Sequence, residues 1–367
     1  MRIFRCACGN QVYFENTQCY ACGRALGFLP EHLTLSAIEP AGEEWQALAP
    51  AASGTLWRMC HNYTYEQVCN WMVAAESGYT FCEACRLNKT IPNLSSSWNR
   101  LLWSRIESGK RRLVYDLLNH ELPFASKVDD PESGLAFQFL ESPDPFGEFA
   151  ADGTDGRVMT GHANGVITIN IAEADDVARE QMRVQMNEAY RTLLGHFRHE
   201  SGHYFWDQLV RDDPEMLAEY RAVFGDERLD YAGALERHYI EGAPSDWWDR
   251  HISKYASSHP WEDWGETWAH YLQMTDALET ALAVGLTARN QRGQAVPQAD
   301  PESVEFSGAA VRRDFNEMLS NWLSLTVALN SINRSLGLGD AYPFALSSAA
   351  ADKLRFVHRV ISRGISP

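Results

Sequence analysis

The sequence predicts an α+β protein in which two small cysteine-rich modules precede one larger, mostly helical domain with a small antiparallel sheet. Three observations support this prediction. All eight cysteines lie between residues 6 and 85, an alternating strand pattern occurs near residue 166, and long stretches with helical spacing fill most of the remainder. We therefore divide the chain into residues 1–29, 30–122 and 123–367.

The composition is that of an acidic globular protein. The 367 residues include 32 Lys+Arg and 49 Asp+Glu, for a formal net charge of −17, and 45% are hydrophobic. Residues 1–120 carry 11 basic and 10 acidic residues, so the acidic excess lies downstream. This charge repels phosphate backbones and anionic lipid, and we expect neither nucleic acid nor a membrane as partner. The first residues lack the apolar core of a signal peptide, which predicts a cytoplasmic protein.

Eight cysteines in a reducing compartment indicate metal binding rather than disulfides. They form two quartets that each contain a C-x-x-C pair: Cys6, Cys8, Cys19 and Cys22, then Cys60, Cys69, Cys82 and Cys85. Four thiolates bind one Zn²⁺ tetrahedrally, so the count fits two structural zinc ions. Residues 1–29 have the zinc-ribbon pattern, with a glycine after Cys8 and after Cys22 where a tight turn needs positive φ. The wider spacing of the second quartet leaves buried thiols or a redox C-x-x-C as alternatives.

Periodicity and turn residues predict the remaining elements in order. They are a linker at Pro30–Ser53, a helix from about Ser97, strands at Leu135–Leu140 and Val166–Ile171, one long helix at about Asp175–Val210, a helix opened by Pro260, and helices at about Ala309–Leu336 and Ser347–Arg363. We expect the basic run Lys110–Arg112 to lie on a solvated helix face.

The long predicted helix carries the sequence His199-Glu200-Ser201-Gly202-His203, an H-E-x-x-H motif. Positions i and i+4 place both imidazoles on one face of the helix, where they can bind one catalytic Zn²⁺. Glu200 beside them can accept the proton of a water that the metal activates.

A catalytic zinc needs a third protein ligand and an open position. In the helix opened by Pro260, the side chains of Glu262, Glu266 and His270 recur at i, i+4 and i+8 on one face. One of them can bind the metal while another orients a ligand histidine. His259, at the entry of this helix, is either a second proton donor or a packing residue.

The two motifs together resemble a known group of peptidases. A Y-x₆-E-x₃-E pattern about 60 residues after H-E-x-x-H resembles the lethal-factor-like gluzincins and the related Mlc-titration-factor peptidases, over His199–Tyr271. The resemblance implies a zincin-like domain in which Glu262 is the zinc ligand, Glu266 supports the site and Tyr255 assists at the oxyanion. Spacing alone leaves Glu266 as an alternative ligand. Gly265 stands where alanine is usual in these families.

The whole layout, with its N-terminal cysteine quartets, is similar to a bacterial family of zinc-ribbon-containing zinc metallopeptidases. The resemblance adds to the architecture, and with the motifs above we expect a zinc-dependent endopeptidase with one catalytic and two structural Zn²⁺ that acts on polypeptides. The alternative is a catalytically retired zincin that serves as a zinc-ribbon interaction module, although the intact Glu200 favours the enzyme. We expect the cysteine modules either to recruit the substrate or to cover the cleft.

Overall fold

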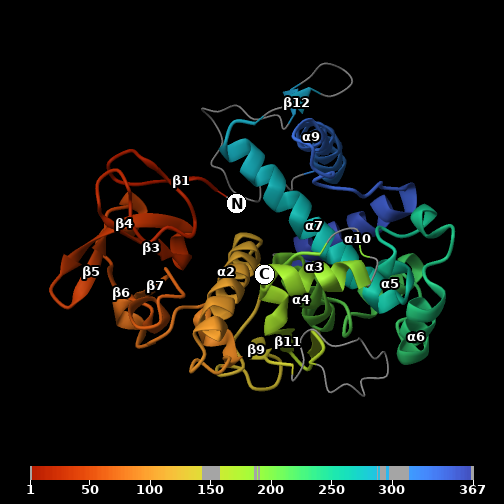
Figure 1. Ribbon diagram of the computed structural model, residues 1–367, viewed down its shortest axis with the longest axis horizontal. Helices are drawn as coiled ribbons and strands as arrows, with labels where there is room; N and C mark the ends of the chain where they lie inside the picture. Colours follow the sequence, from red (N-terminus) through yellow and green to blue (C-terminus); the bar gives the residue numbers. More distant parts are fainter. Residues whose placement is uncertain are drawn as a thin grey trace.

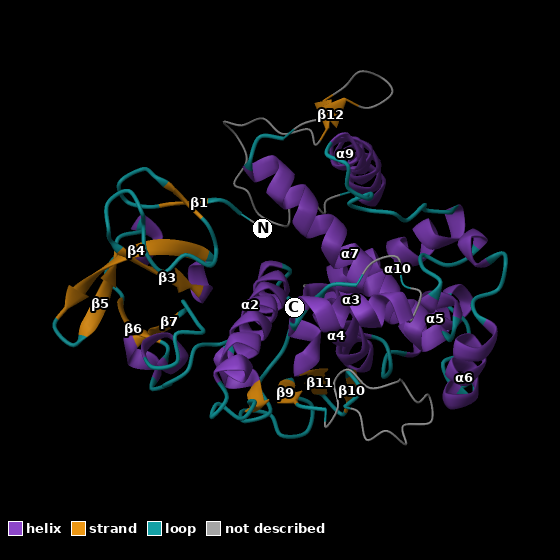
Figure 2. Ribbon diagram, in the orientation of Figure 1, coloured by secondary structure: helices purple, strands orange, loops and turns teal. Residues whose placement is uncertain are grey.

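The computed structural model describes residues 2–142, 158–185, 188, 191–286, 288–289, 295–296 and 314–364. A β-rich N-terminal part lies on one side of the molecule and a helical part on the other, with the long helix α2 between them (Figure 1). Figure 2 shows that the strands β9 (Ala136–Leu140), β10 (Gly161–Ala163) and β11 (Val166–Asn170) lie together at one edge of the helical part. The α+β class that the sequence predicts is therefore confirmed.

The N-terminal part contains a two-stranded hairpin and a five-stranded antiparallel sheet with strand order β3-β4-β5-β6-β7. The hairpin strands are β1 (Phe4–Arg5) and β2 (Gln11–Val12). The sheet strands are β3 (Ala25–Leu29), β4 (Thr34–Ala41), β5 (Glu44–Ala47), β6 (Leu56–Met59) and β7 (Met72–Ala74), and the short helix α1 (His61–Thr64) lies between the last two in sequence.

The prediction of a linker at Pro30–Ser53 is wrong, because this segment supplies β4 and β5. Leu35 and Ala37 of β4 pack in the main core, whereas Ile38 packs in a second cluster on the other side of the sheet. A strand that is buried on both faces lacks the polar-apolar alternation by which strands are recognised.

Helix α2 (Ser97–Asn119) begins at the N-cap Ser96, whose hydroxyl accepts a hydrogen bond from the Asn99 amide at 3.4 Å. The prediction of a solvated face for the basic run is wrong for Lys110 and Arg111, whereas the side chain of Arg112 is 40% exposed. Lys110 is fully buried and pairs with the buried Glu107 at 2.9 Å, and Arg111 is buried as well. The charges remain inside because an acidic partner stands one turn earlier on the same helix.

The sheet of the helical part is mixed rather than antiparallel throughout. Its strands are β8 (Asn88–Thr90), β9 (Ala136–Leu140), β10 (Gly161–Ala163) and β11 (Val166–Asn170), in the order β10-β11-β9-β8. Only β10 and β11 are antiparallel, because a two-residue turn joins them, with positive φ at Asn164 and Gly165. The other neighbours are parallel, which requires the longer connections that the chain has there.

Seven further α-helices are described downstream of β11. They are α3 (Asp176–Gln185), α4 (Leu193–Leu209), α5 (Pro214–Val223), α6 (Tyr231–Glu241), α7 (Pro260–Ala283), α9 (Phe315–Ser335) and α10 (Ser348–Gly364). The described parts of the segment between α7 and α9 include the short strands β12 (Ala288–Arg289) and β13 (Ala295–Val296). The predicted helix at about Ala309–Leu336 begins outside the described residues. No helix in the described part of the chain is long and apolar enough to cross a bilayer.

The single helix predicted from Asp175 to Val210 is wrong, because α3 and α4 are separate. Thr192 is the N-cap of α4, and its hydroxyl accepts a hydrogen bond from the Gly195 amide at 3.0 Å. Helix α4, which carries the H-E-x-x-H motif, therefore begins as a new helix six residues before His199. The predicted opening of α7 at Pro260 is confirmed.

Candidate active site

Helices α4 and α7 cross closely because glycines stand where they meet. A Cβ at Gly265 would lie 2.9 Å from Nε2 of His199, and a Cβ at Gly202 would lie 3.0 Å from Cβ of Trp268. The fully buried indole of Trp264 donates a hydrogen bond to the Gly202 carbonyl at 2.7 Å. The glycine that departs from the usual alanine at position 265 therefore leaves room for the imidazoles.

The crossing brings together the side chains of His199, His203 and Glu262. Nε2 of His199 lies 2.9 Å from Oε2 of Glu262 and 3.2 Å from Nε2 of His203. The third separation, from Nε2 of His203 to Oε2 of Glu262, is 3.8 Å. Ligands that each lie about 2.0–2.2 Å from one tetrahedral zinc ion are about 3.3–3.6 Å apart. The three separations of 2.9, 3.2 and 3.8 Å lie on both sides of this range, so small side-chain shifts would give that geometry.

Glu266 contacts the opposite side of the same imidazole. Its Oε1 lies 2.9 Å from Nδ1 of His199, and its Oε2 accepts a hydrogen bond from the Ser253 hydroxyl at 2.5 Å. Burial alone would lower the pKa of His199, but hydrogen bonds to the two glutamates raise it well above its usual value. The two candidate ligands thus occupy different places, one beside Nε2 and one beside Nδ1.

His203 and His270 are fixed by aromatic neighbours. The ring of His203 stacks on Trp261, with centroids 4.7 Å apart and planes 6° apart. Nδ1 of His270 lies 2.7 Å from the hydroxyl of Tyr342, in the loop before α10. Burial lowers the pKa of His270 to about 4. His270 therefore joins the helix to the C-terminal loop and lies apart from the three gathered ligand atoms.

A cavity of about 770 Å³ opens on these helices and is lined by His199, Glu200, Tyr255 and Glu266 among others. Glu200 is 8% exposed, and burial raises its pKa above the usual value. The ring of Tyr255 lies 5.9 Å from the ring of His199, centroid to centroid. Burial also raises the pKa of Tyr255 well above its usual value, so the phenol keeps its proton.

His259 is the N-cap of α7 and not a group of the cavity lining. Its Nδ1 accepts a hydrogen bond from the Trp261 amide at 3.1 Å, and its Nε2 lies 3.1 Å from the Leu229 carbonyl oxygen. Both ring nitrogens are occupied by backbone groups. The packing interpretation of this residue therefore agrees with the structure, and the proton-donor interpretation does not.

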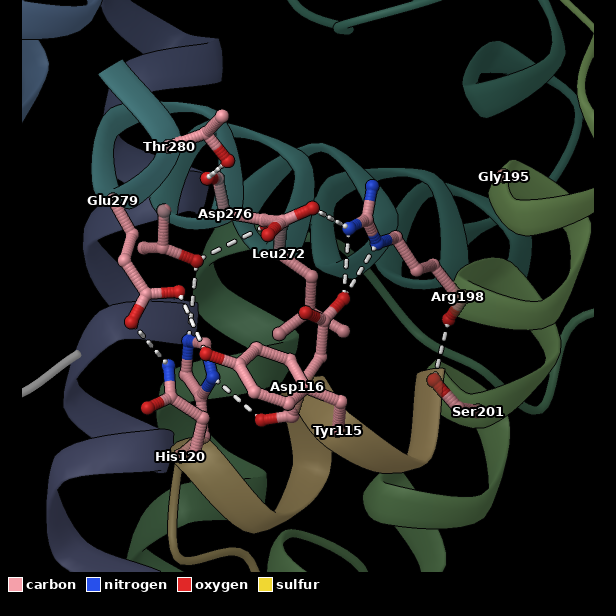
Figure 3. Close-up of polar contacts among 12 residues, drawn as sticks. Tyr115, Asp116, His120, Gly195, Arg198, Ser201, Leu272, Asp276, Glu279 and Thr280 are labelled. Carbon is pink, nitrogen blue, oxygen red and sulfur yellow. Dashed lines mark hydrogen bonds and ion pairs between the residues drawn. The ribbon is translucent and has the colours of Figure 1, made fainter. Parts of the chain in front are cut away.

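Sequence reasoning missed a buried ionic network that holds the motif helix from behind. Figure 3 shows the guanidinium of Arg198 between carboxylates of α2 and α7. Its Nη2 lies 2.7 Å from Oδ2 of Asp116 and 2.7 Å from Oδ2 of Asp276. Burial raises the pKa of Asp116 to about 7 even though Arg198 works against the shift. An arginine directly before the first motif histidine, on a helix that is otherwise buried, was the available signal.

Both cysteine quartets converge in the structure. The ligand atoms of each quartet lie within 4.8 Å of one another. In the first quartet Cys6 and Cys22 are 3.6 Å apart, and Gly9 and Gly23 have φ of 88° and 75° as the turns require. In the second quartet, all four side chains are buried, and the sulfurs of Cys69 and Cys82 are 3.7 Å apart. Such closed sets of four thiols suit structural zinc.

A buried H-E-x-x-H helix that faces a glutamate of a second helix is the arrangement of zinc metallopeptidases. The chain belongs to the family described as "Putative zinc-binding metallo-peptidase", which matches residues 99–360, and a zinc-ribbon domain family matches residues 3–96. Uncharacterized proteins of Mycobacterium tuberculosis and Mycobacterium bovis are 40% identical over 363 residues, which cover 98% of this chain and 95% of theirs. No solved structure matches.

Proposed function

We propose that the protein is a zinc-dependent endopeptidase whose metal is held by His199, His203 and Glu262. The observation that carries this proposal is the convergence of the three ligand atoms within 4.8 Å of one another, beside a cavity that His199 and Glu200 line. Two imidazole nitrogens and one carboxylate oxygen are a donor set of catalytic zinc, which leaves one position open for water or substrate.

Glu262 is the better third ligand because its carboxylate faces Nε2 of His199, near Nε2 of His203. Glu266 lies beside Nδ1, the nitrogen that remains when Nε2 binds a metal. A carboxylate at that nitrogen fixes the tautomer and raises the basicity of the ligand, which is the usual support of a zinc-bound histidine.

When bound, Zn²⁺ supplies Lewis acidity that activates water for attack on a peptide carbonyl. The carboxylate of Glu200 accepts the proton of the attacking water and passes it to the leaving amine. Burial raises the pKa of Glu200 and so makes it a better base than an exposed glutamate. The phenol of Tyr255 remains protonated and donates a hydrogen bond to the oxyanion.

The substrate class we propose is extended polypeptide. Strand β10 is an edge strand of its sheet, and Met159 and Thr160 just before it line the cavity. An unpaired edge can take up an extended segment as an added strand through main-chain hydrogen bonds. The acidic charge excludes nucleic acid as the favoured partner.

We propose two structural zinc ions in the cysteine quartets, which gives three zinc ions per chain. We also propose that the protein is cytoplasmic, because eight cysteines grouped in two quartets that can bind a metal, with no disulfide between them, suit a reducing compartment.

Cleavage of a reduced, unfolded model protein tests the proposal, with Glu200→Gln compared to the wild type. We expect a loss of about 10²–10⁴-fold in kcat with metal content unchanged. The control is Glu219→Gln, which makes the same chemical change in a surface ion pair with Arg359 and should keep full activity. Equal turnover by wild type and Glu200→Gln would reject the mechanism.

The alternative function is a retired zincin that binds partners through its zinc modules. Its distinguishing result is three zinc ions per chain with no turnover of any unfolded substrate by the wild type. Metal analysis of His199→Ala should then still give one zinc ion fewer than the wild type.

A further inference from the structure

Tyr231, the first residue of α6, contacts the proposed zinc ligand from the side away from the histidines. Its hydroxyl donates a hydrogen bond to Oε1 of Glu262 at 2.6 Å. The other carboxylate oxygen, Oε2, lies 2.9 Å from Nε2 of His199. The two oxygens of Glu262 therefore have separate partners.

The phenol ring of Tyr231 is held in place by the entry of α7. It packs edge to face on the ring of His259, with centroids 5.2 Å apart and planes 85° apart. His259 in turn lies 3.1 Å from the Leu229 carbonyl oxygen, two residues before the tyrosine. Asp230 caps α6 through a hydrogen bond from the Gly233 amide. The hydroxyl is thus fixed with respect to Glu262.

Glu262 is only 2% exposed, so its carboxylate depends on protein donors. Within the described part of the chain, Tyr231 is the donor that reaches Oε1. Without the hydroxyl, the buried oxygen would be unsatisfied and the carboxylate could rotate, because it would no longer be held at both ends.

We propose that Tyr231 is a positioning residue that holds Glu262 with one oxygen turned toward the metal and the other turned away. This inference rests on the proposed role of Glu262 as a zinc ligand. The same helix also supports the oxyanion candidate, because Tyr239 shares a hydrogen bond with Tyr255. Tyr239 and its neighbour His238 line the cavity, so α6 orients two functional side chains while it forms part of the substrate wall.

The test is Tyr231→Phe, measured by competition of the full-length protein with a zinc chelator and by the visible spectrum after Co²⁺ replaces zinc. We expect zinc at this site to bind about 10-fold more weakly, in line with the loss of a partner of a metal ligand. The Co²⁺ bands should also change, because the coordination by Glu262 changes. Tyr231 is 43% exposed, so removal of its hydroxyl should not prevent folding.

The matched control is Tyr220→Phe. The hydroxyl of Tyr220 donates a hydrogen bond at 2.9 Å to the carbonyl of Pro260, which lies on α7 like Glu262, but it makes no hydrogen bond to Glu262. Tyr220→Phe should keep the zinc affinity and the Co²⁺ spectrum of the wild type. If Tyr231→Phe and Tyr220→Phe change the zinc affinity and the Co²⁺ spectrum equally, the effect is a general loosening of α7 and the proposal is overturned.

Glu262→Ala separates this inference from the proposed function. Loss of catalytic zinc in Glu262→Ala, with wild-type affinity and Co²⁺ spectrum in Tyr231→Phe, would overturn the role of Tyr231 and leave the ligand set standing. Full zinc binding by Glu262→Ala would overturn both.

Discussion

Replacement of Gly265 by alanine tests the packing on which the candidate site depends. The added Cβ would lie 2.9 Å from Cε1 and Nε2 of His199 and 3.0 Å from Cε1 of His203. Carbon atoms pack at about 3.5–4.0 Å, so the imidazoles must move by roughly 0.5 Å or more. A metal site tolerates errors of about 0.2 Å in its ligand distances. We expect the affinity for catalytic zinc to fall by at least about 10-fold.

Gly265→Ala should lower the free energy of unfolding, although helix propensity alone would raise it. Alanine in place of glycine within a helix normally stabilises by about 1 kcal/mol, whereas overpacking costs about 1–3 kcal/mol. The close contact at Gly265 should therefore give a net loss of up to about 2 kcal/mol, or roughly 4–8 °C in Tm. Chelator competition and thermal unfolding measure the two effects.

Gly339→Ala is the control for this substitution, because a Cβ there meets nothing within 4 Å and the backbone φ is not positive. It should leave zinc affinity and Tm unchanged. If Gly265→Ala binds zinc as tightly as the wild type and melts at the same temperature or higher, the close crossing of α4 and α7 is refuted.

Three further predictions concern charge and metal. Burial raises the pKa of the Glu173 carboxyl, but His196 and Arg191 outweigh burial and lower this pKa from 4.5 to about 2. A depressed carboxyl stabilises the fold above its unfolded pKa, so Glu173→Gln should cost about 3 kcal/mol at pH 7 and pH 5. Urea unfolding should show a smaller difference in the free energy of unfolding between wild type and Glu173→Gln at pH 4 than at pH 7. A larger difference at pH 4 would contradict this prediction. Arg198→Met should cost about 3–5 kcal/mol by leaving the buried carboxylate of Asp116 without its ion-pair partner, whereas Arg228→Met, in an exposed pair, should cost less than about 1 kcal/mol. A chelator should remove zinc from the partly exposed first quartet before the buried second one, and simultaneous release would count against two separate sites.

The two glutamates of α7 show best what can be predicted from the sequence and what cannot. Helical periodicity places Glu262 and Glu266 on one face and predicts that both meet the motif histidines. It cannot tell them apart, because the choice depends on how α7 crosses α4. The crossing depends on Gly202 and Gly265, whose lack of side chains is a packing property with no periodic signal.

The contacts of Tyr231 and the partners of Arg198 could not be predicted from the sequence for a related reason. Tyr231 reaches Glu262 from 31 residues upstream, on a helix with Ala234 as its buried residue, so no apolar pattern marks it. Arg198 is satisfied by carboxylates 82 and 78 residues away. Local spacing predicts neighbours on one helix, whereas these contacts depend on how separate helices pack.

The packing of α2 bears on what the cysteine modules do for the candidate site. The cavity lining begins at Val158, so within the described chain neither quartet covers the cavity. Helix α2 instead carries Arg111, which donates to the Val68 carbonyl beside the second quartet, and Asp116, which pairs with Arg198 next to the first motif histidine. These two residues are five positions apart, about 7.5 Å along one rigid helix. Zinc in the second quartet would therefore fix the helix that supports the peptidase motif, which favours bracing or recruitment over a role as a lid.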